Sequence, residues 1–125
     1  MNATLLVMAG GAVGAAARYN LGRLVFHWIG PGLPFGTLIA NIMGSFLMGV
    51  LAGVLARSNF SDEPWRLLLG VGLLGGFTTF SAFSLEVLNM IERGNWGIAL
   101  GYALLSVAGS VMALFMGLIA VRVLA

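Results

Sequence analysis

The sequence predicts an all-α integral membrane protein of four transmembrane helices, on the basis of its composition, its turn signals and its tryptophans. Hydrophobic residues make up 60% of the 125 positions and charged residues only 8%, whereas about a quarter of an ordinary globular chain is charged. So few charges cannot cover a water-soluble domain, and lipid is therefore the expected solvent. Helices are expected because open strands would leave backbone groups unpaired in lipid.

Three turn-forming stretches divide the apolar sequence. They are a Gly/Pro turn at 30–34, the polar run at 57–65 and the sequence ERGNW at 92–96. The predicted spans, in one domain covering residues 1–125, are 4–28, 34–57, 65–92 and 96–123. Each exceeds the roughly 20 residues that a hydrocarbon core requires.

The first span is interpreted as a membrane helix and not as a cleaved signal. No positively charged region precedes it, and its apolar run is too long for a signal sequence. Trp28 ends this span, and Trp65 and Trp96 begin the third and the fourth, at the positions where interfacial aromatic residues are enriched.

The second and fourth spans each carry a polar stripe. Thr37, Asn41 and Ser45 recur every four residues on the second span, and Tyr102, Ser106 and Ser110 do so on the fourth. A single hydroxyl in a span most often bonds to its own helix or joins two helices. Two complete stripes with an asparagine instead favour a narrow polar path across the membrane.

The third span is expected to break near its middle, within the sequence GGFTTFSAFS at 75–84. Two glycines followed by four hydroxyl residues make a poor continuous helix. A break at membrane depth frees carbonyl and amide groups that can bind ions. Phe80 and Phe83 are three residues apart and share a face, for which contact with lipid or packing is the alternative explanation.

A pathway rich in hydrogen-bond donors and poor in acids favours an anion as its cargo. Arg18 is a candidate for the positive potential of a vestibule, and Glu86 is the one acid well inside a span. Ser81 and Ser84 add hydroxyls beside the break. Arginines are almost evenly divided between the two sides, so the positive-inside rule sets little orientation and an antiparallel dimer is permitted.

Many of the 19 glycines fall at the four-residue spacing by which helices approach closely in lipid. The predicted contact pairs are Gly10/Gly14, Ala40/Gly44, Gly49/Gly53, Gly72/Gly76 and Gly97/Gly101.

Other functions lack support in the sequence. The arginines are scattered, so nucleic acid is not an expected partner. The GxGxxG match at 70–75 lies inside a span with no preceding strand, which argues against a nucleotide. No nucleophile–base pair and no metal-binding constellation indicate an enzyme.

Three motifs together resemble the Fluc family of small dual-topology fluoride channels, also called CrcB. They are GGAVGAAARY at 10–19, GTLIANIMGSF at 36–46 and GGFTTFSAFS at 75–84. The sequence departs from the family at Ala82, where threonine is common, and so loses one hydroxyl near the break.

The resemblance implies a passive, selective fluoride channel that exports fluoride across the bacterial plasma (inner) membrane and relieves its toxicity. The working unit would be an antiparallel homodimer with two pores. The implied pore residues are Phe80, Phe83, Asn41, Thr37, Tyr102, Ser106 and Ser110, with Arg18, Glu86, Ser81 and Ser84 at a vestibule or pore end. A structural Na⁺ ion on the dimer axis would be held by the carbonyls of Gly75 and Thr78.

Two rival functions remain open. A small four-helix multidrug/proton antiporter would need a carboxylate in the first span, and residues 4–28 contain none. A non-transporting membrane scaffold would explain the glycines but not the polar stripes or the broken helix.

Overall fold

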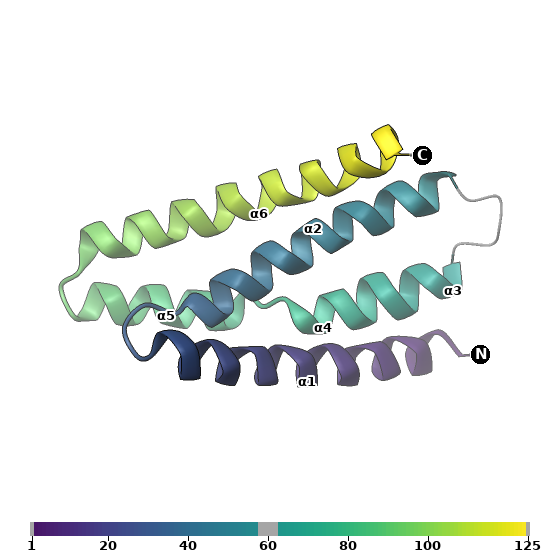
Figure 1. Cartoon of the computed structure of the whole chain (residues 1–125). Helices are drawn as coiled ribbons and strands as arrows, with labels where there is room; N and C mark the ends of the chain where they lie inside the picture. The colour runs from purple at the N-terminus through teal and green to yellow at the C-terminus, as the bar shows by residue number, and fades with distance from the viewer. Residues whose placement is uncertain (1, 58–62, 125) are drawn as a thin grey trace.

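The computed structural model describes residues 2–57 and 63–124, and within these ranges it is helical with no strand. Its elements are α1 (Ala3–Ile29), α2 (Phe35–Arg57), α3 (Glu63–Trp65), the π-helix η1 (Arg66–Leu74), α4 (Gly75–Phe77), α5 (Ser81–Glu92) and α6 (Trp96–Leu124). Figure 1 shows an elongated bundle with both termini at the same end. This arrangement agrees with an even number of passes along the bundle.

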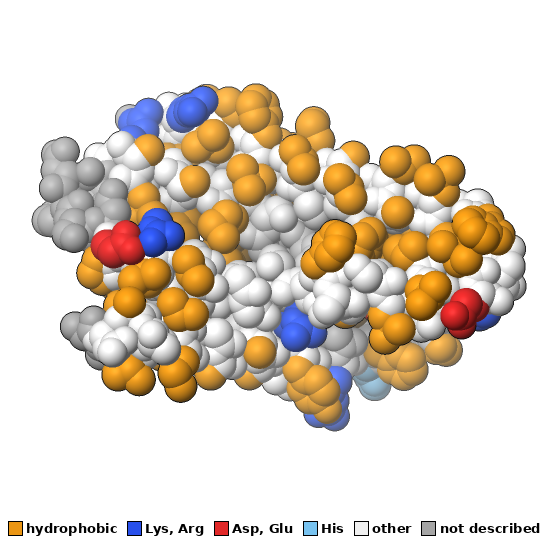
Figure 2. Space-filling view, turned by 180° about the vertical axis from the view of Figure 1, so that it is seen from behind, with side chains coloured by type: hydrophobic (Ala, Val, Ile, Leu, Met, Phe, Trp, Pro, Cys, Tyr) orange, Lys and Arg blue, Asp and Glu red, His pale blue; other side chains and the backbone are white. Residues whose placement is uncertain are grey.

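The predicted spans agree with the helices to within two residues at each boundary that the structure describes. Among the described residues, three stretches are long and apolar enough to cross a membrane: Phe35–Arg57, Glu63–Glu92 and Trp96–Leu124. Hydrophobic side chains cover much of the face seen in Figure 2, as expected of a surface in lipid.

Helix α1 is 27 residues long, but Arg18, Asn20 and Arg23 make its second half more polar than the other spans. Its crossing of the membrane as a fourth span therefore stays a prediction. The predicted polar loop between the second and third spans lies largely outside the described residues.

The third span is interrupted, as the sequence predicts. The helix stops after Phe77, and Thr78 adopts an extended conformation (φ −88°, ψ 160°) before α5 begins at Ser81. The part before the break, η1 with α4, packs on α1, whereas α5 packs on α6. The break thus lets one span change its packing partner halfway along the bundle (Figure 1).

Segment η1 is a feature that the sequence did not predict. Its nine residues form a π-helix, and the Gly75 N–H at its end donates to the carbonyls of Gly70 and Gly72. π-helical turns are rare and often accompany functional sites. Here the wider turn directly precedes the break.

Glycines allow the close helix contacts that the sequence predicts. A Cβ atom at Gly14 would overlap the Leu73 carbonyl, and one at Gly49 would overlap the Leu114 carbonyl. The helix pairs α1/η1 and α2/α6, which these glycines join, have the most extensive packing in the bundle. The predicted pair Gly97/Gly101 is different, because nothing lies within 4 Å of a Cβ at either position.

The turns at the far end of the bundle depend on glycine. Gly30 (φ 87°) ends α1, and its N–H donates to the Phe26 carbonyl at 2.8 Å. Gly94 (φ 81°) lies in the turn between α5 and α6. Both need a left-handed backbone conformation that residues with a Cβ rarely adopt.

A small buried cluster holds the starts of α2 and α6 against α5. Its members are Leu38, Phe83, Met90, Ala99 and Tyr102. It fixes the positions of Phe83 and Tyr102, two of the predicted pore residues, and so sets the geometry of the site.

Candidate functional site

The break in the third span is held by the side chain of Asn41. The Thr79 N–H donates to Asn41 Oδ1 at 2.7 Å, and Asn41 Nδ2 donates back to the Thr79 carbonyl at 2.9 Å. Both backbone groups of Thr79, which a continuous helix would satisfy internally, are thus satisfied by one side chain. An amide nitrogen carries two hydrogens, so one N–H of Asn41 is left for another acceptor.

Helix α5 begins on a side-chain cap that the sequence analysis missed. Thr79 Oγ1 accepts the Ala82 N–H at 3.2 Å and lies 3.3 Å from Ser81 Oγ. Threonine before a helix commonly plays this role. The signal was present in the sequence, since Thr79 lies three residues before Ala82 directly after the glycines.

The same contacts leave two carbonyls free. In a continuous helix the Gly75 carbonyl would accept the Thr79 N–H, and the Thr78 carbonyl would accept the Ala82 N–H. These two amides donate instead to Asn41 Oδ1 and Thr79 Oγ1. Neither carbonyl accepts a backbone amide from the described part of the chain. Carbonyls freed at a helix break are the ligands that Na⁺ takes in membrane proteins.

A cavity of about 300 Å³ lies beside the break, between α2 and α6. Its lining residues are Asn41, Ser45, Thr78, Thr79, Phe80, Phe83, Ser106, Val107, Ser110 and Val111. No acid lines it, and both polar stripes contribute to its wall. Five of the seven predicted pore residues therefore line one cavity, namely Asn41, Phe80, Phe83, Ser106 and Ser110.

Ser106 gives the clearest indication that this cavity can take a polar ligand. It is only 5% exposed, yet its Oγ atom has no hydrogen-bond partner among the described residues. Leaving a buried hydroxyl unpaired costs roughly 1–3 kcal/mol. The hydroxyl is therefore available to a polar ligand or an ion in the cavity.

The two polar stripes also meet at Glu86, which lies toward the end of the bundle opposite the termini. Thr37 Oγ1 donates to Glu86 Oε2 at 2.8 Å, and the Tyr102 hydroxyl donates to Oε1 at 2.8 Å. One carboxylate from α5 thereby joins α2 to α6. Thr37 and Tyr102 thus donate their hydroxyl hydrogens to Glu86. An anion passing these residues would compete with the Glu86 carboxylate for the same two donors.

The aromatic rings form a short series. Phe80 and Phe83 have centroids 5.4 Å apart and are tilted by 51°, and Phe83 lies 5.5 Å from the Tyr102 ring. Phe83 is buried at 8% exposure, whereas Phe80 is 74% exposed at the break. A phenyl ring edge carries partial positive charge, so a tilted ring beside the cavity can face an anion.

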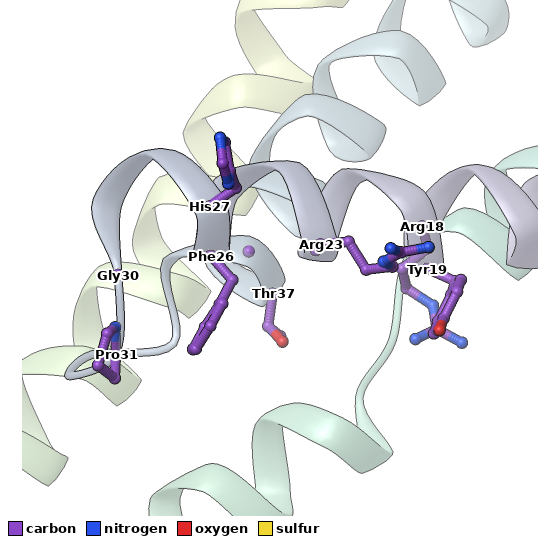
Figure 3. A pocket seen from close by; sticks show the side chains of 10 residues that line it. Arg18, Tyr19, Arg23, Phe26, His27, Gly30, Pro31 and Thr37 are labelled. Atoms are coloured by element: carbon purple, nitrogen blue, oxygen red, sulfur yellow. The ribbon is translucent and has the colours of Figure 1, made fainter.

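Arg18 lines a separate and larger cavity of about 750 Å³. Figure 3 shows Arg18, Tyr19 and Arg23 at one end of this cavity and Gly30 with Pro31 at the other. Arg18 Nε makes a long hydrogen bond of 3.4 Å to the Gly76 carbonyl, directly before the break. The guanidinium of Arg23 lies 5.9 Å from the centre of the Tyr19 ring.

A protein-family model described as "CrcB-like protein, Camphor Resistance (CrcB)" matches residues 5–118 of the chain. The chain belongs to the CrcB family. A relative from Phenylobacterium zucineum is 63% identical over 123 residues, which cover 98% of this chain and 97% of the relative. Relatives from Caulobacter vibrioides (54% over 123 residues, 98% and 97% covered) and Erythrobacter litoralis (52% over 128 residues, 98% and 94% covered) are also similar. All three are named "Fluoride-specific ion channel FluC".

The predicted site residues of this CrcB family chain divide into two connected groups. Around the break lie Asn41, Thr78, Phe80, Phe83, Ser106 and Ser110. Around Glu86 lie Thr37 and Tyr102. Phe83 belongs to both, because its ring also contacts Tyr102.

Two predicted residues make only local contacts. Ser84 Oγ donates to the Phe80 carbonyl of its own helix at 2.9 Å, and Ser81 lies beside Thr79. Both are exposed on this chain. Their part in a pore end stays a prediction.

Proposed function

We propose that the chain is a passive, selective fluoride channel, and not an enzyme, that exports fluoride across the bacterial plasma membrane and relieves fluoride toxicity. The observation that carries the proposal is the name shared by relatives up to 63% identical over nearly the whole chain. The geometry beside the break agrees with it, because the cavity offers hydroxyl and amide donors without an acid.

Fluoride is small and strongly hydrated, so a selective pore must replace its water with several donors held close together. The unpaired Ser106 hydroxyl, the remaining Asn41 N–H and the edges of the phenylalanine rings supply such donors. These groups hold their positions before an ion arrives, and prearranged donors need little reorganisation. Glu86 marks one end of this donor-lined path, because its carboxylate competes with fluoride for the Thr37 and Tyr102 hydroxyls.

The working unit that we propose is an antiparallel homodimer, with α1 as the fourth span of each copy. Phe80 is 74% exposed on the single chain although it adjoins the cavity. A large aromatic side chain beside a polar cavity would meet lipid there, and a second copy would cover both. Two equivalent cavities then give two pores.

A structural Na⁺ ion on the two-fold axis is part of the same proposal. The carbonyls of Gly75 and Thr78 accept no backbone amide within the described residues, and two copies would present four such oxygens. The ion would balance the partial negative charge of these carbonyls and fix the two breaks relative to each other.

The decisive experiment is fluoride efflux from potassium-loaded liposomes containing the purified protein. Valinomycin is added, and a fluoride electrode records release, with matched runs in chloride. A channel releases fluoride without a proton gradient and does not release chloride. The multidrug/proton antiporter would move cations with a proton gradient and the scaffold would move nothing, so the absence of fluoride efflux from folded protein overturns the proposal.

A further inference from the structure

A groove lies between α2 and α6, toward the end of the bundle that carries both termini. Its volume is about 370 Å³, and its lining residues are Phe46, Val50, Ala120, Val121 and Leu124. The lining is apolar. It is separate from the polar cavity beside the break, and neither the pore nor the sodium site uses any of its residues.

The groove is shallow because glycines draw the two helices together. A Cβ atom at Gly117 would overlap the Phe46 carbonyl, and one at Gly53 would lie 2.9 Å from Val121 Cβ. The flanking side chains therefore stand above a floor of backbone. Leu124 (87% exposed) and Phe46 (38% exposed) remain accessible at its two ends.

The Arg57 guanidinium lies at the end of the groove, because it contacts the backbone of Arg122, the residue that directly follows the lining residue Val121. Arg57 ends α2, Arg122 lies in the last turn of α6, and Arg57 Nη2 donates to the Arg122 carbonyl at 3.2 Å. Figure 2 shows basic side chains at the upper left of the molecule, next to hydrophobic side chains. At this end of the described chain, Glu63 is the acid present, and it pairs with Arg66 at 2.6 Å.

The stretch of α2 from the groove residue Phe46 to the arginine at the end of the helix matches one membrane leaflet. Phe46 and Arg57 are eleven positions apart on one helix, a rise of roughly 16 Å at 1.5 Å per residue. This is about half of the roughly 30 Å hydrocarbon core, the depth that one acyl chain occupies. Cationic side chains at the level of the headgroups attract anionic lipid.

We propose that this groove binds an anionic phospholipid, with an acyl chain between α2 and α6 and the headgroup phosphate on Arg57 and Arg122. A zwitterionic lipid would fit the same apolar walls but would gain less from two guanidinium groups. A free phosphate ion is not the proposed occupant, because a soluble anion would make no use of the apolar groove. In an antiparallel dimer each leaflet would hold one such lipid.

The test measures thermal unfolding of the purified protein in a mild detergent while lipid is added. Phosphatidylglycerol is compared with phosphatidylcholine of the same acyl chains and with glycerol 3-phosphate. We expect phosphatidylglycerol to raise the unfolding midpoint most and glycerol 3-phosphate to leave it unchanged. Native mass spectrometry on the same samples should show phosphatidylglycerol retained in preference to phosphatidylcholine.

The variant Arg57→Gln/Arg122→Gln should bind phosphatidylglycerol about 30-fold more weakly, and Arg57→Lys/Arg122→Lys should retain most of the binding. Arg23→Gln/Arg93→Gln, a pair near the other end of the bundle, is the matched charge control. The proposal is overturned if the glutamine variant binds like the unchanged protein, or if the control pair loses as much. It is equally overturned if phosphatidylcholine or glycerol 3-phosphate gives the full effect.

A groove variant separates lipid from a second copy of the chain. Val121→Trp narrows the groove and should weaken phosphatidylglycerol binding while the oligomeric mass stays the same. A change of oligomeric mass in this variant would mean that another copy covers the groove, and the lipid proposal would fail.

Discussion

Replacing Asn41 by leucine removes the side-chain contacts that hold the break while nearly conserving volume. The change leaves the Thr79 N–H and the Thr79 carbonyl without their partners at 2.7 and 2.9 Å. Both groups are partly buried, and each unsatisfied group costs roughly 1–3 kcal/mol. Because the break can relax and water can enter the adjoining cavity, we expect the lower part of the summed range, about 2–4 kcal/mol of unfolding free energy.

The effect on transport follows from the same two bonds. Without Asn41 no side chain holds the Thr79 amide and carbonyl, so the backbone of the break loses its fixed position. Phe80, the next residue along the chain, is then no longer held beside the cavity. We therefore expect Asn41→Leu to abolish fluoride efflux, and Asn41→Asp to lose it as well, since a carboxylate facing the Thr79 carbonyl repels both that oxygen and fluoride.

The assay combines equilibrium unfolding in mixed micelles, titrated with sodium dodecyl sulfate, with fluoride efflux from liposomes. Hydrogen exchange at the Thr79 amide reports the bond directly and should become much faster in Asn41→Leu. Asn20→Leu is the matched control, because the Asn20 side chain bonds only to the exposed Ala16 carbonyl of its own helix. Unchanged stability and unchanged Thr79 exchange in Asn41→Leu would refute the reasoning.

Three further predictions concern other parts of the structure. Glu86→Gln should lower the unfolding free energy by about 1–2 kcal/mol and slow efflux, because a neutral acceptor binds the Thr37 and Tyr102 hydroxyls less strongly. Unchanged stability and unchanged efflux would count against a role of Glu86 in joining α2 to α6. Ser106→Ala should leave stability unchanged or slightly higher while efflux falls, since its hydroxyl is buried and unpaired; a clear loss of stability would show that the hydroxyl serves packing. Gly49→Ala should lower the unfolding free energy by more than about 2 kcal/mol in the dodecyl sulfate titration, because the added Cβ overlaps the Leu114 carbonyl. Gly101→Ala should not, since nothing lies within 4 Å of a Cβ at that position. Similar effects of the two substitutions would contradict the packing argument.

Much of the fold was predictable because it depends on short-range properties of the chain. Composition required a lipid environment, and turn residues placed the helix boundaries. The glycines and hydroxyls at 75–84 predicted the break that the structure has at 78–80. The π-helix was not predicted by any local pattern, and η1 packs closely on Gly10 and Gly14 of α1, residues far from it in the sequence.

The spacing of the two polar stripes placed Asn41 and Ser106 on helix faces that line one cavity in the structure, and their part in a pore stays a prediction. The bonds that these side chains make were not predictable from the spacing. Asn41 was expected as a donor to an ion, whereas in the structure one N–H and the carbonyl oxygen of that side chain hold Thr79. Glu86 was expected at a pore end, and the structure adds that it joins two predicted pore residues.

The sequence by itself determined that this chain is a set of apolar helices with donors and a break in the interior, because hydropathy, helix propensity and spacing act over a few residues. Only the tertiary structure decided which groups meet. The Asn41–Thr79 and Thr37–Glu86 contacts join residues 38 and 49 positions apart, and the arginine pair at the end of the groove joins residues 65 positions apart. Such contacts depend on the angle and depth at which helices pack, which no local pattern in the chain specifies.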